Sequence, residues 1–294
     1  PPHVLQATRV GRPYVMSKLA MPHATVISAR ELQTMPAPAR YMLHLGDNAL
    51  ILAQRLGEWG GHGPILEEDI SLTNTALDLL GQARLLYTRV GELHAKDLNE
   101  DDYAYWRDEF AFFNWTLCEL PNAPLAAGTV AQDRDYAITV VRNALYSALM
   151  LHMWQALQHS VDPQLAGIAA KSVKETRYHW QHARMWLVRL GDGTDQSHDK
   201  AQNALVQMLP YMQECFNDNA LDQECAHNGV GVLPSSVKAS WLADMHSAVT
   251  EATLTWPSMD GFVSRGKLGQ HSEHMGFLLA DMQSVTRAHP GARW

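Results

Sequence analysis

The chain has 294 residues, enough for a substantial hydrophobic core, and its composition excludes several classes of protein. Hydrophobic residues make up 46%, which excludes global disorder. Charged residues make up only 18%, below the roughly 25% of a typical soluble domain. The net charge of −8 argues against a nucleic-acid partner, because such a partner needs a basic surface. We expect a chain with so few charges to hide much of its surface in its core or against other subunits.

Cysteine content and hydropathy predict a cytoplasmic protein that does not enter a membrane. Cys118, Cys215 and Cys225 have no metal-binding spacing, and such a sparse set is typical of reduced thiols. The longest stretch without Asp, Glu, Lys or Arg covers residues 143–161 but contains several other polar residues, which favours a buried helix over a membrane span. Residues 1–38 lack the apolar run of a signal peptide, and we predict that they form an N-terminal extension.

Helical periodicity dominates the chain from residue 39 onward, and strand-like alternation is nearly absent. Helix ends are marked by Asn99 as an N-cap, by Asp162 and Pro163 as an N-cap and first helical residue, and by Gly191 near a C-terminus. The predicted helices cover, in chain order, residues 39–59, 65–94, 99–119, 129–160, 163–190, 196–217, 236–253 and 272–288.

The longest predicted helices decide the fold class. A helix of 30 residues is about 45 Å long at about 1.5 Å per residue, too long for a small globin-like fold. Long helices joined by short turns form antiparallel bundles. The apolar surface of the 65–94 helix is also wide, which implies burial on more than one side. We therefore predict one all-α domain over residues 39–294, a ferritin-like helical bundle with accessory helices.

A di-iron site in such a bundle requires carboxylates from four helices and two Glu-x-x-His pairs, because residues three apart share one helix face. The only Glu-x-x-His pair in the chain is Glu224–His227, which runs directly into Asn228-Gly229. A helix that ends in a loop cannot supply the centre of a bundle. The required pattern is therefore missing.

Two long helices nevertheless carry polar residues within an apolar background. These candidates for a polar core are Asn74, Asp78, Gln82, Glu175, Tyr178, His179 and His182. A carboxylate and an imidazole on one stripe could bind a metal, but the residue three after Asp78 is Gly81, and the residue three after Glu175 is Tyr178. We therefore favour a metal-free network of hydrogen bonds, with no catalytic, cofactor-binding or metal-binding residue in this chain.

Several separated segments resemble the C-subunit family of bacterial phenylacetyl-CoA epoxidases (PaaC). They are LGDNALILAQRLGEWGGHGP (45–64), LDLLGQAR (77–84), DPQLAGIAAKSVKETRYHW (162–180), RLGDGTD (189–195) and HSEHMGFLLADMQ (271–283). The terminal PGARW fits as well, so the resemblance covers about residues 40–294 and leaves out residues 1–38.

The resemblance implies a ferritin-like component of a multicomponent oxygenase that inserts one atom of O₂ into the ring of phenylacetyl-CoA, giving a 1,2-epoxide. In this family the A subunit holds the di-iron centre, a reductase with flavin and an iron–sulfur centre brings electrons from NADPH, and the C-type chain is a structural partner without metal ligands. Gly81, Gln82 and Tyr178 fit such a loss of ligands.

Three hypotheses follow from the sequence. The first is a non-catalytic scaffold that binds the di-iron A subunit and self-associates when alone. The second is a di-iron carboxylate oxidase in its own right, using Glu175, His179, Asp78 and further acids. The third is an unrelated all-α adaptor. The missing Glu-x-x-His pairs favour the first over the second, and the order of the matched segments argues against the third.

Overall fold

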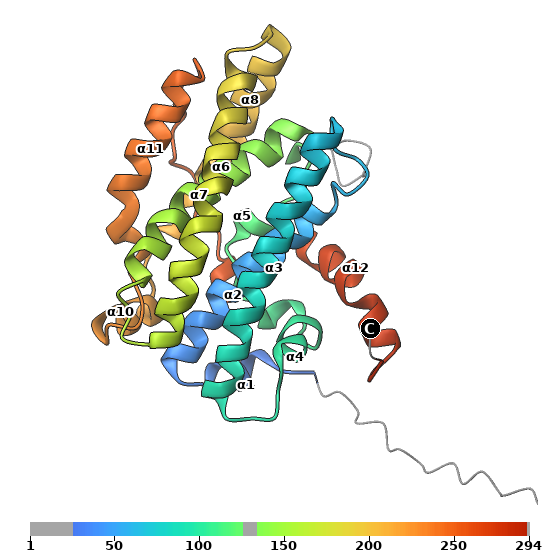
Figure 1. Ribbon diagram of the computed structural model, residues 1–294, viewed down its shortest axis with the longest axis vertical. Helices are drawn as coiled ribbons and strands as arrows, with labels where there is room; N and C mark the ends of the chain where they lie inside the picture. The colour runs from blue at the N-terminus through green and yellow to red at the C-terminus, as the bar shows by residue number, and fades with distance from the viewer. Residues whose placement is uncertain (1–25, 126–133, 293–294) are drawn as a thin grey trace, which may run out of the picture.

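The computed structural model describes residues 26–125 and 134–292, and every regular element within them is a helix. The long helices are α2 (Ala37–Gly57), α3 (Leu66–His94), α6 (Tyr136–Leu157) and α7 (Pro163–Gly191). Helix α2 packs along α3, α6 packs along α7, and contacts between α3 and α7 join the two pairs (Figure 1). The all-α prediction is confirmed, and the arrangement is consistent with a ferritin-like bundle.

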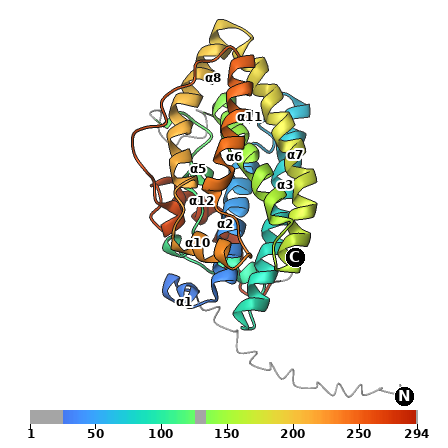
Figure 2. The ribbon, with the colours of Figure 1, turned by 90° about the vertical axis from the view of Figure 1, so that its left-hand side faces the viewer.

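Shorter helices surround the two pairs, and α8 and α11 pack on α6 and α7 (Figure 2). These helices are α1 (Ala29–Gln33), α4 (Glu100–Tyr105), α5 (Thr116–Glu119), α8 (Asp195–Met208), α9 (Met212–Cys215), α10 (Ala220–His227), α11 (Lys238–Glu251) and α12 (His274–Ala288). Ile27, Leu32 and Met35 are buried, so residues 26–38 pack against the helical body. No helix in the described part of the chain is both long and apolar enough to cross a membrane.

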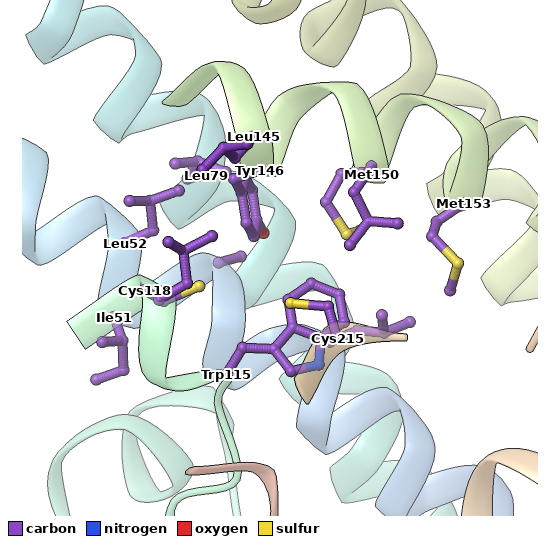
Figure 3. Close-up of a cluster of buried hydrophobic side chains, with 14 of the residues drawn as sticks. Ile51, Leu52, Leu79, Trp115, Cys118, Leu145, Tyr146, Met150, Met153 and Cys215 are labelled. Atoms are coloured by element: carbon purple, nitrogen blue, oxygen red, sulfur yellow. The ribbon is translucent and has the colours of Figure 1, made fainter. Parts of the chain in front are cut away.

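The centre of the bundle is filled by apolar and sulfur-containing side chains (Figure 3). Leu52 of α2, Leu79 of α3 and Leu145 of α6 belong to this cluster with Cys118, and Cys215 lies near Trp115 in the same cluster. Both cysteines are free and fully buried, and burial raises the pKa of both thiols well above the ordinary value. They therefore act as small apolar residues rather than as nucleophiles.

The predicted helix over residues 99–119 is wrong. The structure has α4, one short 3-10 helix at Glu109–Ala111, and α5, with extended chain between them. Side chains from other helices bind the backbone N–H groups that a continuous helix would use. The N–H of Phe113 donates to Asp47 (2.8 Å), that of Trp115 to Asn48 (2.7 Å) and that of Thr116 to Glu214 (2.9 Å). Such side-chain acceptors compete with the helical hydrogen bonds.

Two other predicted boundaries also differ from the structure. The predicted helix over residues 196–217 is divided into α8, a short 3-10 helix that contains Pro210, and α9, because proline has no N–H to donate. Helix α10 has no counterpart among the predicted helices. The predicted start of the 129–160 helix lies outside the described residues, and the described part of α6 begins at Tyr136.

The connector between α11 and α12 is held by two buried carboxylates. Glu119 accepts hydrogen bonds from the ring of His271 (2.6 Å) and from the N–H of Ser272 (2.6 Å). Glu214 accepts from Ser264 Oγ (2.7 Å) and from the N–H of Lys267 (2.7 Å). Two carboxylates thus replace regular secondary structure in fixing this segment against the bundle.

Candidate functional site

A row of polar contacts joins α3 and α7, and it includes most of the polar residues singled out in the sequence. His179 Nε2 lies 2.9 Å from Asp78 Oδ2, and Gln82 Nε2 donates to Glu175 Oε2 at 3.0 Å. Lys171 Nζ lies 3.4 Å from the other oxygen of Glu175. Residue numbers rise along α3 as they fall along α7, so the two helices are antiparallel. We call this row the α3–α7 seam.

The end of the seam near the start of α3 contains residues that the sequence reasoning missed. His182 Nε2 lies 2.9 Å from Glu68 Oε2 and 3.1 Å from Ser71 Oγ. The hydroxyl of Tyr136 on α6 donates to Glu68 at 2.5 Å. Burial, followed by this hydrogen bond to Glu68, raises the pKa of Tyr136, so its hydroxyl stays protonated as the donor.

The spacing of the seam explains which predicted residues belong to it. Its positions alternate steps of three and four: Glu68, Ser71, Thr75, Asp78 and Gln82 on α3, and Ser172, Glu175, His179 and His182 on α7. A mean step of 3.5 keeps a row facing a neighbouring helix, whereas two successive steps of four turn it by about 80° at about 100° per residue. Asn74 lies two steps of four before Gln82 and is exposed to solvent. A search at alternating three and four spacing would have found Glu68.

Tyr178 also lies outside the seam and is 53% exposed. Its ring stacks on the ring of His182, with centroids 6.1 Å apart and 24° between the planes. The structure therefore brings together Asp78, Gln82, Glu175, His179 and His182 in one row. It places Asn74 and Tyr178 on the solvent side of that row.

The solvent side of the seam is a single face shared by both helices. In two antiparallel right-handed helices, the positions one residue before the contact row turn toward the same side. Those positions are Glu67, Ile70, Asn74, Leu77 and Gly81 on α3, and Lys171, Lys174, Tyr178 and Gln181 on α7, with Met185 continuing the row one turn further along α7. We call them the outer face. Helices α3 and α7 lie side by side in Figure 1 and again at one edge of Figure 2.

Large apolar side chains of the outer face are unusually exposed. Ile70 is 51% exposed and Leu77 is 59% exposed, with Met185 partly exposed on α7. Near Gly81, no atom beyond the adjoining helix backbone and chain neighbours lies within 4 Å of the position that a Cβ would occupy, so another surface can approach the backbone there. Exposed apolar and aromatic side chains occupy the middle of this face, whereas Glu67 lies toward one end and Lys171 and Lys174 toward the other. An apolar centre with a charged rim has the character of a protein–protein interface.

The seam does not fit a di-iron centre. Asp78 and Glu175 each already contact a partner side chain on the opposite helix, and the Asp78 side chain is 40% exposed. Within residues 26–125 and 134–292, no three His, Cys, Asp or Glu side chains come together as a metal-binding group. The side chains labelled at the bundle centre include leucines, Tyr146 and two cysteines, but no carboxylate and no imidazole (Figure 3). Di-iron bundles instead direct carboxylates and histidines from four helices into that centre.

The fold and this site define a class: an all-α helical bundle with an interface-like face and an apolar centre. Comparison with known proteins gives the family. Residues 24–294 match the family described as Phenylacetic acid catabolic protein. Over 254 residues, the chain is 42% identical to the C subunit of 1,2-phenylacetyl-CoA epoxidase from Escherichia coli (strain K12), covering 86% of this chain and 98% of that protein. The chain therefore belongs to the phenylacetic acid catabolic protein family.

Proposed function

We propose that this chain is a structural, non-catalytic subunit of a multicomponent phenylacetyl-CoA 1,2-epoxidase, an O₂- and NADPH-dependent oxygenase of aerobic phenylacetate catabolism in the cytoplasm. The observation that carries the proposal is the 42% identity over 98% of the length of the epoxidase relative. The match extends over nearly the whole length of that relative. The role of the relative is therefore the best guide to the role of this chain.

The proposal assigns the cofactors to other subunits. The di-iron centre belongs to the A subunit, and flavin and an iron–sulfur centre belong to the reductase. The support from this chain is chemical: the centre of the bundle is lined by leucines, and the seam carboxylates are paired across two helices. No catalytic step is assigned to any residue of this chain.

The outer face is proposed as the surface that binds the A subunit. Exposed Ile70, Leu77 and Tyr178 would each lose contact with water on binding, and apolar burial contributes about 25 cal/mol per Å². Obligate interfaces bury roughly 2,000 Å² or more, which two helices of this length can supply. In the absence of the A subunit, the same face is expected to pair with a second copy of this chain.

Co-purification with a tagged A subunit tests the proposed interface. Leu77→Arg places a charge at its centre and is expected to weaken the complex by a factor of roughly 100 or more, because a buried unpaired charge is costly. Val206→Arg on α8 is the matched control, since Val206 is a similarly exposed apolar residue on another helix. Equal recovery of both variants with the A subunit would reject this interface.

Activity with single components omitted tests the subunit role. NADPH oxidation coupled to phenylacetyl-CoA should require the A subunit, the reductase and this chain together. Turnover by this chain and the reductase alone would reject the scaffold role. It would support the second candidate, a di-iron oxidase, which is favoured only by the acid–imidazole pairs at Asp78 and His179 and at Glu68 and His182. Elemental analysis separates the two, because the oxidase requires stoichiometric iron in this chain.

A further inference from the structure

A hollow on another side of the molecule from the seam is lined by positively charged side chains. It has a volume of about 300 Å³ and lies among α1, α2, the N-terminus of α10 and the connector before α12. Its cationic side chains are Arg40 and Lys267, and the imidazole of His44 lies between α2 and Phe113. No described residue that lines this hollow is a carboxylate. We call it the Arg40 pocket.

The charges of the pocket differ in how they are compensated. Lys267 is only 6% exposed and its ammonium group contacts Asp222 Oδ2 at 3.3 Å and the carbonyl of Asn217. The Arg40 guanidinium forms no ion pair or side-chain hydrogen bond with any residue in the described ranges. An unpaired guanidinium beside a buried ammonium group favours an anion.

Backbone groups add to this preference. Helix α10 begins at Ala220, and its first residues, Ala220 and Leu221, line the pocket after the N-cap Asn219. The capping box at Asn219 uses the N–H of Asp222 but neither N–H of these two residues. Their N–H groups have no acceptor among the described residues and remain for a bound oxyanion, while the Asp222 carboxylate in the same turn accepts the N–H of Asn219.

The rest of the lining is apolar. Leu32, Leu43, Leu221 and Leu268 line the hollow together with Phe113, whose ring stacks on His44 with centroids 5.0 Å apart. Leu32, Leu43, Leu221 and Phe113 are nearly fully buried and Leu268 is 55% exposed, so they offer a bound molecule an apolar wall beside the charged groups. A carboxylate with an aromatic or aliphatic body would satisfy both the charged and the apolar parts of the lining.

We propose that the Arg40 pocket binds a small carboxylate with an apolar body, of the size of an arylacetate, with its carboxylate at Arg40 and the start of α10. This site is separate from the proposed partner-binding face, and the choice of an arylacetate rests on the family and so on the proposed function. Arg40 is the anchor of the ligand, since its charge has no competing partner among the described residues.

Isothermal titration calorimetry of the purified chain with phenylacetate as the probe tests this site. The expected result is saturable binding that Arg40→Gln weakens roughly tenfold or more, whereas the same substitution at an exposed arginine of α7, Arg177→Gln, keeps it within about twofold. The neutral 2-phenylethanol and the small acetate ion should each bind much more weakly than phenylacetate. Far-UV circular dichroism and a melting curve establish that both variants are folded.

Three results would overturn the proposal: no saturable binding of phenylacetate, equal binding by Arg40→Gln and the unaltered chain, or equal binding of 2-phenylethanol. Tighter binding of inorganic phosphate than of phenylacetate would overturn the apolar part of the assignment.

The imidazole of His44 supplies a second readout. Burial, followed by the charges of Arg40, Lys267 and Arg107, lowers the pKa of His44 to about 3. Asp222, the nearby acid, is engaged by Lys267. A carboxylate bound in the pocket should raise the pKa of His44, measured by NMR with His44→Gln to assign the signal. An unchanged pKa at saturating phenylacetate would contradict binding at this place.

Discussion

Carboxylate–histidine pairs occur in two very different regions of this molecule. In the α3–α7 seam, Asp78 pairs with His179 at 2.9 Å, and the Asp78 side chain is 40% exposed. At the connector before α12, Glu119 pairs with His271 at 2.6 Å, and both side chains are fully buried. The Asp78–His179 pair is therefore in contact with solvent, whereas the Glu119–His271 pair is shielded from it.

The comparison shows that burial and connectivity decide what such a pair does. Asp78 and His179 join two helices that apolar residues on their inner sides already hold in place, so this partly exposed pair adds little stability. The Glu119 carboxylate, in contrast, accepts further hydrogen bonds from Asn114 Nδ2 (2.9 Å) and from the N–H of Ser272. It therefore links segments that are more than 150 residues apart in the sequence. Exposed pairs contribute little, whereas breaking a buried pair is costly.

The largest effect is expected for Glu119→Ala. It leaves His271 and two further donors without an acceptor in the core, and the free energy of unfolding should fall by about 3–5 kcal/mol. Urea denaturation followed by circular dichroism measures this change. A loss below about 1 kcal/mol would mean that the buried pair does not hold the connector.

The pH dependence of stability should also single out the buried pair. Burial lowers the pKa of His271, but the hydrogen bond and charge of Glu119 outweigh burial and raise the pKa overall. Stability from this pair is therefore complete below the unfolded pKa of about 6.5 and is lost as pH rises through the higher folded pKa.

Unfolding free energies measured between about pH 6.5 and 8 test this prediction. His44, His94 and His274 have lowered pKa values, so their contributions change only below about pH 6.5. His271→Gln should remove the decline seen in the unaltered chain. A decline of the same slope in the variant would assign it to other groups.

A much smaller effect is expected in the seam. Asp78→Ala should lower the free energy of unfolding by about 1 kcal/mol or less, because the pair with His179 is partly exposed. The measurement is the same urea denaturation, with Glu119→Ala as the reference. A loss as large as that of Glu119→Ala would remove the distinction between the two regions.

The smallest effect on stability is expected on the outer face. Leu77→Arg should change the free energy of unfolding of the isolated chain by less than about 0.5 kcal/mol, since Leu77 is 59% exposed. A melting curve at low protein concentration measures it. This result, together with loss of the complex with the A subunit, would separate a binding role from a structural one.

Local sequence patterns predicted the long helices well. Helices α3 and α7 begin and end within about two residues of the predicted positions, because apolar periodicity and the Asp162 cap are local signals. Five of the seven predicted polar residues meet in the seam for the same reason. Asn74 and Tyr178 were misplaced, because a step of four drifts around a helix while packed rows advance by 3.5 on average.

The sequence by itself determined the helical class, the long elements and the lack of the two Glu-x-x-His pairs of a di-iron site, since all of these depend on residues that are near one another in the chain. Tertiary structure decided the broken 99–119 segment, the Glu119 and Glu214 contacts, and the Arg40 pocket. Each of these arises where side chains from distant segments compete for backbone hydrogen bonds or gather around a hollow. A local sequence pattern cannot predict these contacts between distant segments, because they form only when the helices pack together.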